Sequence, residues 1–221
     1  MSIEPRVQIL VEYAKWTARA AVNVGTCPIK ARKPIYRLLD GVAFAGVLSD
    51  VVVSPERFDA WHQRETEALC HRANKHLHDI AHENGQEPTE FPVVWSAKLI
   101  NVFLKTAVYA GGLGREGLRD VLHPPLDNGL RKGLKKHFHG RSDMLEKVDF
   151  GAIKHITDYT HSAGSSNVSP PTYRIVIEGC RVAAKELGCS LIEVEQLAGL
   201  GLGPDEEPPG KLVSAICRYV R

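Results

Sequence analysis

The segment from Val93 to Ala110, VVWSAKLINVFLKTAVYA, constrains the fold more than any other part of the chain. Its spacing predicts one helix, and at about 100° per residue the apolar side chains cover nearly the whole circumference. Only Lys98, Asn101 and Lys105 interrupt the apolar surface, and they fall within about 60° of one another. Such a helix is expected to be buried, and the polar groups on its one narrow stripe need partners.

Most of the remaining chain has the spacing of amphipathic helices. Apolar residues recur at three- and four-residue steps, and we expect helices over 6–22, 54–83, 128–138, 150–161, 172–188, 191–200 and 211–220. The segment 41–53, GVAFAGVLSDVVV, is as compatible with a buried helix as with two short strands. SAGSSNVSPP, residues 162–171, is the clearest linker. The sequence therefore predicts a mainly α fold.

Composition and charge limit the compartment and the partner. The five cysteines are scattered and never form a Cys-x-x-Cys pair, which favours free thiols in a reducing compartment. The N-terminal sequence lacks a basic-then-apolar export signal, and apolar uncharged runs such as 41–49 are too short to cross a membrane. The net charge is only +2, but RKGLKKHFHGR, residues 131–141, contains no acid. We expect a cytoplasmic protein with one local contact to an anionic partner.

Lys98 is the strongest candidate for a reactive side chain. It lies in the first turns of its helix, shortly after Phe91-Pro92, where the positive end of the helix dipole disfavours a second positive charge. Burial acts in the same direction, so both effects are expected to lower the lysine pKa and favour the neutral amine. A neutral amine is a nucleophile that can attack a sugar C1′ or a carbonyl carbon and form a Schiff base.

Asp127 follows the run Leu122-His123-Pro124-Pro125-Leu126. The two prolines prevent a helix there and hold the chain extended, and a helix is predicted to begin directly after the aspartate. Asp127 is therefore expected to be the N-cap of that helix. A carboxylate held by so rigid an approach can also stabilise a developing cation or transfer a proton. The pattern alone leaves both interpretations open.

These two motifs together carry a family resemblance. The run KLINVFL, residues 98–104, followed by HPPLD, residues 123–127, resembles the catalytic segment of the helix-hairpin-helix DNA glycosylase superfamily. The interval is similar to that of the archaeal 8-oxoguanine (GO) glycosylase branch, in which a second lysine follows one heptad later, as Lys105 does here. RVAAKELGCSLIEVEQLAGLG, residues 181–201, is similar to the C-terminal helix pair of that branch. The family's short Gly-apolar-Gly hairpin and its C-terminal tryptophan are absent.

The resemblance implies a fold, an activity and a partner. It implies one helix-hairpin-helix glycosylase-like unit over residues 1–221, with two helical subdomains and a cleft between them. The approximate subdomains are 54–161, with the hairpin and catalytic segment, and 1–53 plus 162–221, the packing subdomain. The implied activity is that of a DNA glycosylase and AP lyase that removes a damaged or modified base, with an oxidised purine favoured and no cofactor. The implied partner of the monomer is double-stranded DNA in the nucleoid, with a flipped modified base.

The same resemblance implies roles for individual residues. Lys98 would attack C1′ to displace the base, and Asp127 would stabilise charge on the sugar and help to deprotonate the amine. Asn101, Trp95 and Lys105 are expected to contact the substrate. Phosphates would be bound by the basic side chains that begin one turn after the aspartate: Arg131, Lys132, Lys135 and Lys136.

Two other functions fit parts of the sequence. A non-catalytic helical module that binds nucleic acid or another protein would use Lys98 and Lys105 for phosphate contacts and Asp127 only as a helix cap. A metal-dependent enzyme would use the histidines between residues 62 and 82, although HDIAHE lacks the residue order of a zinc-binding HExxH motif.

Overall fold

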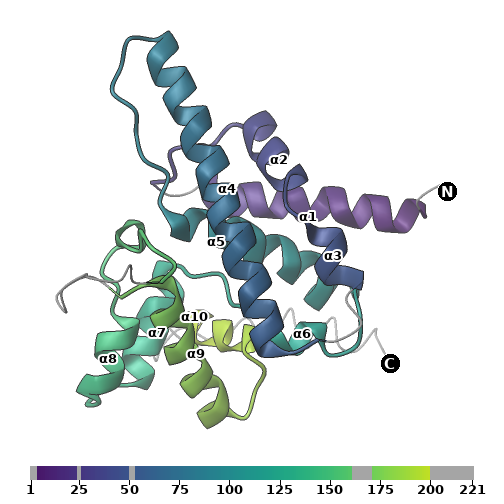
Figure 1. Ribbon diagram of the computed structural model, residues 1–221. Helices are drawn as coiled ribbons and strands as arrows, with labels where there is room; N and C mark the ends of the chain where they lie inside the picture. Colours follow the sequence, from purple (N-terminus) through teal and green to yellow (C-terminus); the bar gives the residue numbers. More distant parts are fainter. Residues whose placement is uncertain (1–3, 24–25, 50–52, 161–170, 200–221) are drawn as a thin grey trace.

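The computed structural model describes residues 4–23, 26–49, 53–160 and 171–199. These residues form helices and loops with no β-strand among them, which confirms the predicted mainly α class. Figure 1 shows α1 to α5 in one part of the molecule and α7 to α10 in another. The predicted helix over 211–220 and residues 162–170 of the predicted linker 162–171 lie outside the described residues.

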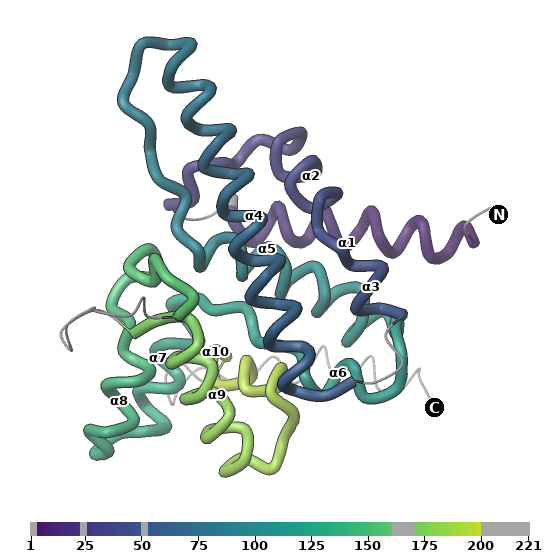
Figure 2. Tube along the Cα trace, in the orientation of Figure 1, coloured from purple at the N-terminus to yellow at the C-terminus, as the bar shows by residue number. Residues whose placement is uncertain are grey.

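The first group of helices is built around α5. Its members are α1 (Pro5–Asn23), α2 (Arg32–Asp40), α3 (Phe44–Ser49), α4 (Pro55–Glu83) and α5 (Val93–Leu104). Both α1 and α4 pack on α5, and the C-terminal end of α4 extends beyond the body of the protein, as the tube in Figure 2 also shows. Where 41–53 left two alternatives open, the described part is helical as α3.

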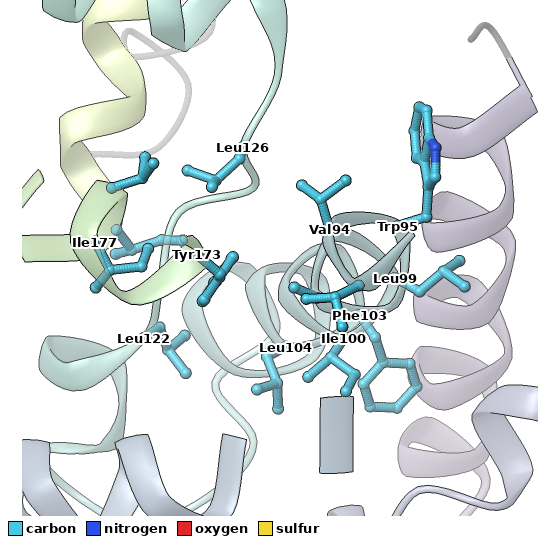
Figure 3. Close-up of a cluster of buried hydrophobic side chains, with 14 of the residues drawn as sticks. Val94, Trp95, Leu99, Ile100, Phe103, Leu104, Leu122, Leu126, Tyr173 and Ile177 are labelled. Carbon is cyan, nitrogen blue, oxygen red and sulfur yellow. The ribbon is translucent and has the colours of Figure 1, made fainter. Parts of the chain in front are cut away.

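The apolar helix predicted from Val93 to Ala110 is the core of the protein. It consists of α5 and a π-helical continuation, η1 (Lys105–Ala110). Figure 3 shows Trp95 and Leu99 projecting toward α1, while the chain carrying Leu122 and Leu126 lies on another side. The segment is long and apolar enough to cross a membrane, but 72% of it is buried inside the described structure. That degree of burial is typical of a core helix.

The second group consists of short helices around α9. Its members are α7 (Asn128–His137), α8 (Ser142–Val148), η2 (Ile153–His155), α9 (Tyr173–Leu187), η3 (Ile192–Glu195) and α10 (Gln196–Gly199); α6 (Leu118–Val121) precedes them. α7 packs on α10, and α8 packs on α9. Gly133 permits the first of these contacts, because a Cβ at this position would overlap the carbonyl group of Leu197.

The helix predicted over 150–161 is wrong. In its described part, 150–160, the one helical turn is η2, and α8 forms earlier in the chain. Gly151 has a φ of 61°, which is outside the right-handed helical region. Ile153, Ile156 and Tyr159 are nevertheless buried. Their three-residue spacing resembles that of a helix, but an irregular chain delivers these side chains to the core.

Two further predictions can be compared with the arrangement of the helices. Within the predicted helix 191–200, the described chain is helical over 192–199 but divided between η3 and α10, and the Ser190 N–H donates to Glu193 Oε2 at 2.9 Å, as in a capping box. The predicted subdomain boundary between 161 and 162 separates α8 from α9, yet these helices pack together. In the described structure α1 packs on α5 rather than on the C-terminal helices.

Candidate active site

Lys98 and Asp127 line the same open cleft. The cleft has a volume of about 570 Å³ and lies where the end of α1, the first turns of α5, the start of α7 and η2 meet. Residues from several of these elements line it, including Trp95, Lys98, Asp127, Asn128, Gly129 and Lys154. The tertiary structure therefore brings together the two groups that the sequence singled out.

The environment of Lys98 favours the neutral amine. The side chain is half-buried, and this burial lowers the pKa of Lys98 below its ordinary value, although the nearby carboxylates of Asp127 and Glu195 act in the opposite direction. Its Nζ lies 5.6 Å from the centre of the Trp95 ring. At a given pH a larger fraction of this amine is unprotonated than in an exposed lysine, which is what nucleophilic attack requires.

Asp127 is held by the helix that it begins. Its Oδ1 accepts a hydrogen bond of 2.9 Å from the Leu130 N–H, so the predicted N-cap of α7 is confirmed. Pro124, Pro125 and Leu126 are buried and lead the chain into this cap without helical structure. Asp127 itself is only half-buried and lines the cleft. Its carboxylate is therefore both fixed in position and accessible.

Trp95 lies against the wall of the cleft rather than across its opening. Only 3% of the residue is exposed, and its ring projects toward α1 (Figure 3). The indole Nε1 has no hydrogen-bond partner among the described residues. The ring packs in the core beneath the Lys98 amine, and a stacking contact between Trp95 and a substrate base stays a prediction.

The structure places Asn101 and Lys105 outside the cleft that holds Lys98 and Asp127. Asn101 is 1% exposed, and its amide donates to the Pro124 carbonyl at 3.1 Å. Lys105 forms an ion pair with Glu195 at 2.6 Å. The α-helix becomes a π-helix at Lys105, so a constant step of about 100° per residue does not describe the direction of that side chain.

The basic run divides into paired and exposed side chains. Arg131 and Lys135 both form ion pairs with Asp149, at 2.9 and 2.6 Å. Lys132 and Lys136 are exposed. This division follows from the helix, because residues 131 and 135 lie on the same side of α7 and residues 132 and 136 on the next. The exposed pair is the part of the run best able to meet a phosphate.

The structure adds cleft residues that the sequence did not indicate. Lys154 is exposed and lines the cleft from η2, and Asn128 and Gly129 line it from the first turn of α7. Nothing local in the sequence marks Lys154, because it belongs to a segment that is brought to the cleft only by packing. Its ammonium group supplies a positive charge at the edge of the cleft.

The histidines of α4 have very different surroundings. His62 is fully buried, whereas His71, His78 and His82 are exposed. Within the described residues, no group of three or more His, Cys, Asp or Glu side chains lies close enough together to hold a metal ion.

Comparisons with protein-family models, with curated proteins and with solved structures find no match for this chain. The geometry and the charges of the cleft are therefore the basis for assigning a function.

Proposed function

We propose that this protein is a DNA glycosylase with AP-lyase activity that acts through Lys98. The observation that carries the proposal is a half-buried lysine, with a lowered pKa, in one cleft with the carboxylate of Asp127. The cleft volume of about 570 Å³ is within the range of roughly 300–1,000 Å³ that is common for sites of small organic groups. A nucleoside flipped out of a duplex is a group of that size.

In the proposed reaction the lone pair of Lys98 Nζ forms a bond to C1′ as the bond from C1′ to the base breaks. The base leaves with the electron pair of the broken glycosidic bond and takes up a proton, while Asp127 accepts a proton from the attacking amine. The C1′–O4′ bond then opens to give the imine. Removal of a 2′ proton expels the 3′ phosphate by β-elimination, and water later hydrolyses the imine. No oxidant or reductant is consumed.

The fold proposed for this function is the glycosylase-like one, with the cleft between two helical parts. The first part contributes Lys98 from α5, and the second contributes Asp127 at the start of α7. The negative charge of Asp127 would stabilise the positive charge that develops on the sugar as the base departs. A monomer bound to double-stranded DNA in the cytoplasm is sufficient for this reaction.

Exposed lysines near the cleft support a contact with the DNA backbone. Lys154 lines the cleft itself, and Lys132 and Lys136 are exposed on α7, the helix that Asp127 begins. Such contacts are electrostatic and independent of the base sequence, so they position the duplex without selecting the lesion. We propose that the excised base is an oxidised purine.

Borohydride trapping tests the proposal directly. Duplexes that contain an abasic site or 8-oxoguanine are incubated with the protein and borohydride, and the covalent adduct is quantified on a denaturing gel. We expect an adduct with the unaltered protein and none with Lys98→Ala. Lys75→Ala, which removes an exposed lysine of α4, is the matched control and should trap as well as the unaltered protein.

The possible outcomes separate the enzyme from the alternative. DNA binding without any adduct on either duplex would support a non-catalytic nucleic-acid-binding module. An adduct on the abasic duplex alone would support a lyase whose base differs from 8-oxoguanine, and a wider panel of lesions would then identify that base.

A further inference from the structure

A connected set of buried polar side chains lies between α4, α5, α9 and the segment that leads to Asp127. We call it the buried polar network; its members are Asp59, His62, Asn101, His123, Tyr159 and Tyr173. All but Asp59 are at most 5% exposed. None of these side chains is needed by the chemistry proposed above, and an apolar core of similar volume is often at least as stable. Stability alone therefore does not explain why these polar side chains are buried here.

The direction of the hydrogen bonds is determined by one backbone group. The Pro124 carbonyl can only accept, so the atom of Asn101 that lies 3.1 Å from it must be the amide nitrogen. The amide oxygen of Asn101 then faces His62 Nε2 at 2.7 Å, which must carry a hydrogen. His62 Nδ1 is consequently an acceptor, and the Tyr159 hydroxyl donates to it at 2.8 Å.

The second branch has a determined direction too. The Asn101 amide also donates to the Tyr173 hydroxyl at 2.8 Å, so that hydroxyl is free to donate to His123 Nδ1 at 3.2 Å. The Asp59 carboxylate can only accept, so His123 carries its hydrogen on Nε2 and donates to Asp59 Oδ1 at 2.9 Å. Arg181 completes the branch by donating to both oxygens of Asp59. Burial lowers the pKa of both histidines, so each is neutral at pH 7, with its hydrogen on Nε2 and with Nδ1 as an acceptor.

The network meets the segment that leads to Asp127 at the Asn101–Pro124 bond and at His123, the residue before Pro124, and of these only the first bond comes directly from the helix of Lys98. Asn101 is one helical turn after Lys98 on α5, and Pro124 lies three residues before Asp127. One turn of helix is about 5 Å long and rigid, and three residues of extended chain span at most about 10 Å. Two adjacent prolines and the fully buried Leu126 restrict that short span. The Asn101–Pro124 bond is therefore a strut between the two candidate catalytic groups.

We propose that the Asn101–Pro124 hydrogen bond, held in one direction by the buried polar network, sets the separation of the Lys98 amine and the Asp127 carboxylate. Asn101 is then a positioning residue rather than a contact to the substrate. His62 supports it by donating to the amide oxygen. This inference rests on the proposed function for its biological meaning, but the geometry that it describes can be tested without DNA.

The test measures the titration of Lys98 in the whole protein. Reductive methylation with formaldehyde and cyanoborohydride, followed by peptide mass spectrometry, gives the pH midpoint at which Lys98 becomes reactive. The titratable groups that act on this amine are Asp127, Glu195 and, once its thiol ionises, Cys27, and Lys154 shares the cleft. Of these, only Asp127 is tied to the strut.

Loss of the Asn101–Pro124 bond should lower the Lys98 midpoint, as loss of the Asp127 charge does. Asp127→Asn removes a negative charge and should lower the Lys98 midpoint. We expect Asn101→Ala to lower it in the same direction, by about half a pH unit, which is about threefold in the neutral fraction. Tyr159→Phe is the matched control. It removes one hydrogen bond from the same network on the far side of His62, where Thr66 Oγ1, at 3.4 Å from Nδ1, can replace the donor. In Tyr159→Phe the Lys98 midpoint should not change.

A folded Asn101→Ala variant with an unchanged midpoint would overturn the inference, even if DNA trapping succeeds. If Asn101→Ala does not fold, the Lys98 midpoint is measured instead in the milder variant Asn101→Ser, where a decrease relative to the unaltered protein is expected. Nitrogen NMR of the unaltered protein should show His62 and His123 with the hydrogen on Nε2, and the opposite tautomer of either would also overturn it. If the midpoints change as predicted but trapping fails, only the proposed glycosylase function is contradicted.

Discussion

The amide nitrogen of Asn101 donates a hydrogen bond of 3.1 Å to the carbonyl oxygen of Pro124. This bond joins the helix that carries Lys98 to the segment that ends at Asp127. Both partners are buried, so the bond is protected from competition with water, and breaking it would leave unsatisfied polar groups in the core. The position of the candidate catalytic pair thus depends on a side chain that does not line its cleft.

The structural and chemical roles of Asp127 can be separated by two substitutions. Asparagine caps helices as well as aspartate does, so Asp127→Asn should leave the free energy of unfolding nearly unchanged while it removes the charge. Asp127→Ala should lower the free energy of unfolding by about 1 kcal/mol through loss of the bond to the Leu130 N–H. Urea unfolding gives the stabilities, and single-turnover trapping gives the activity.

Activity is expected to fall strongly in both Asp127 variants. The cap explanation alone would be supported if Asp127→Asn trapped DNA as fast as the unaltered protein.

The protein should lose stability as the pH falls below about 6.5. Burial is the main reason that the pKa values of His62 and His123 are below their ordinary value of 6.5. Below that value the unfolded chain binds protons that the folded protein does not, so the free energy of unfolding decreases as the pH falls. Urea midpoints from neutral to acid pH measure this slope. His62→Gln should reduce it, and His71→Gln, which changes an exposed histidine of the same helix, should not.

Asp59 should add a second loss of stability at lower pH. Burial acts to raise the pKa of Asp59, but hydrogen bonds from His123 and Arg181 outweigh it and hold the pKa at about 2. The folded-state pKa is therefore below the ordinary value of 3.8. Its contribution is complete above that value and is lost as the pH falls from there toward 2. In Asp59→Asn the unfolding midpoint should be lower at neutral pH, and this acid step should be absent.

Gly133→Ala should destabilise the contact between α7 and α10. The new Cβ would overlap the Leu197 carbonyl, which is backbone and cannot rotate away. We expect a loss of about 1–3 kcal/mol in the free energy of unfolding. Gly46→Ala is the control, because Gly46 is in α3 and a Cβ there meets nothing within 4 Å. Alanine at that helical position should be neutral or stabilise by about 0.5–1 kcal/mol. Equal effects of the two variants would contradict the packing described here.

Lys154 should contribute more to DNA binding than Lys135. Lys154 is exposed at the cleft, whereas Lys135 is held by Asp149 at 2.6 Å. Lys154→Ala should weaken binding to any duplex sequence and reduce the slope of log K against log salt by about 0.9, which is one phosphate contact. Fluorescence anisotropy over a series of salt concentrations measures this slope. An unchanged slope would remove Lys154 from the interface.

Several features could be predicted from the sequence because they depend on residues close together in the chain. The start of α4 at Pro55 can be recognised from its N-cap Ser54, and the N-cap role of Asp127 follows from the double proline before it. The periodicity of α1 and the apolar circumference of α5 predict helices at the correct positions. Where spacing misled, over 150–161, buried side chains came from an irregular segment around Gly151.

By itself the sequence determined a mainly α fold, a core helix that carries Lys98, and a capped carboxylate at Asp127, because propensity, periodicity and capping act over a few residues. Only the tertiary structure decided that these two groups share a cleft, that Lys154 joins them, and that Asn101 turns inward to Pro124. Those relations arise from the packing of segments far apart in the chain. Packing determines which way each side chain faces, and the local spacing of residues does not.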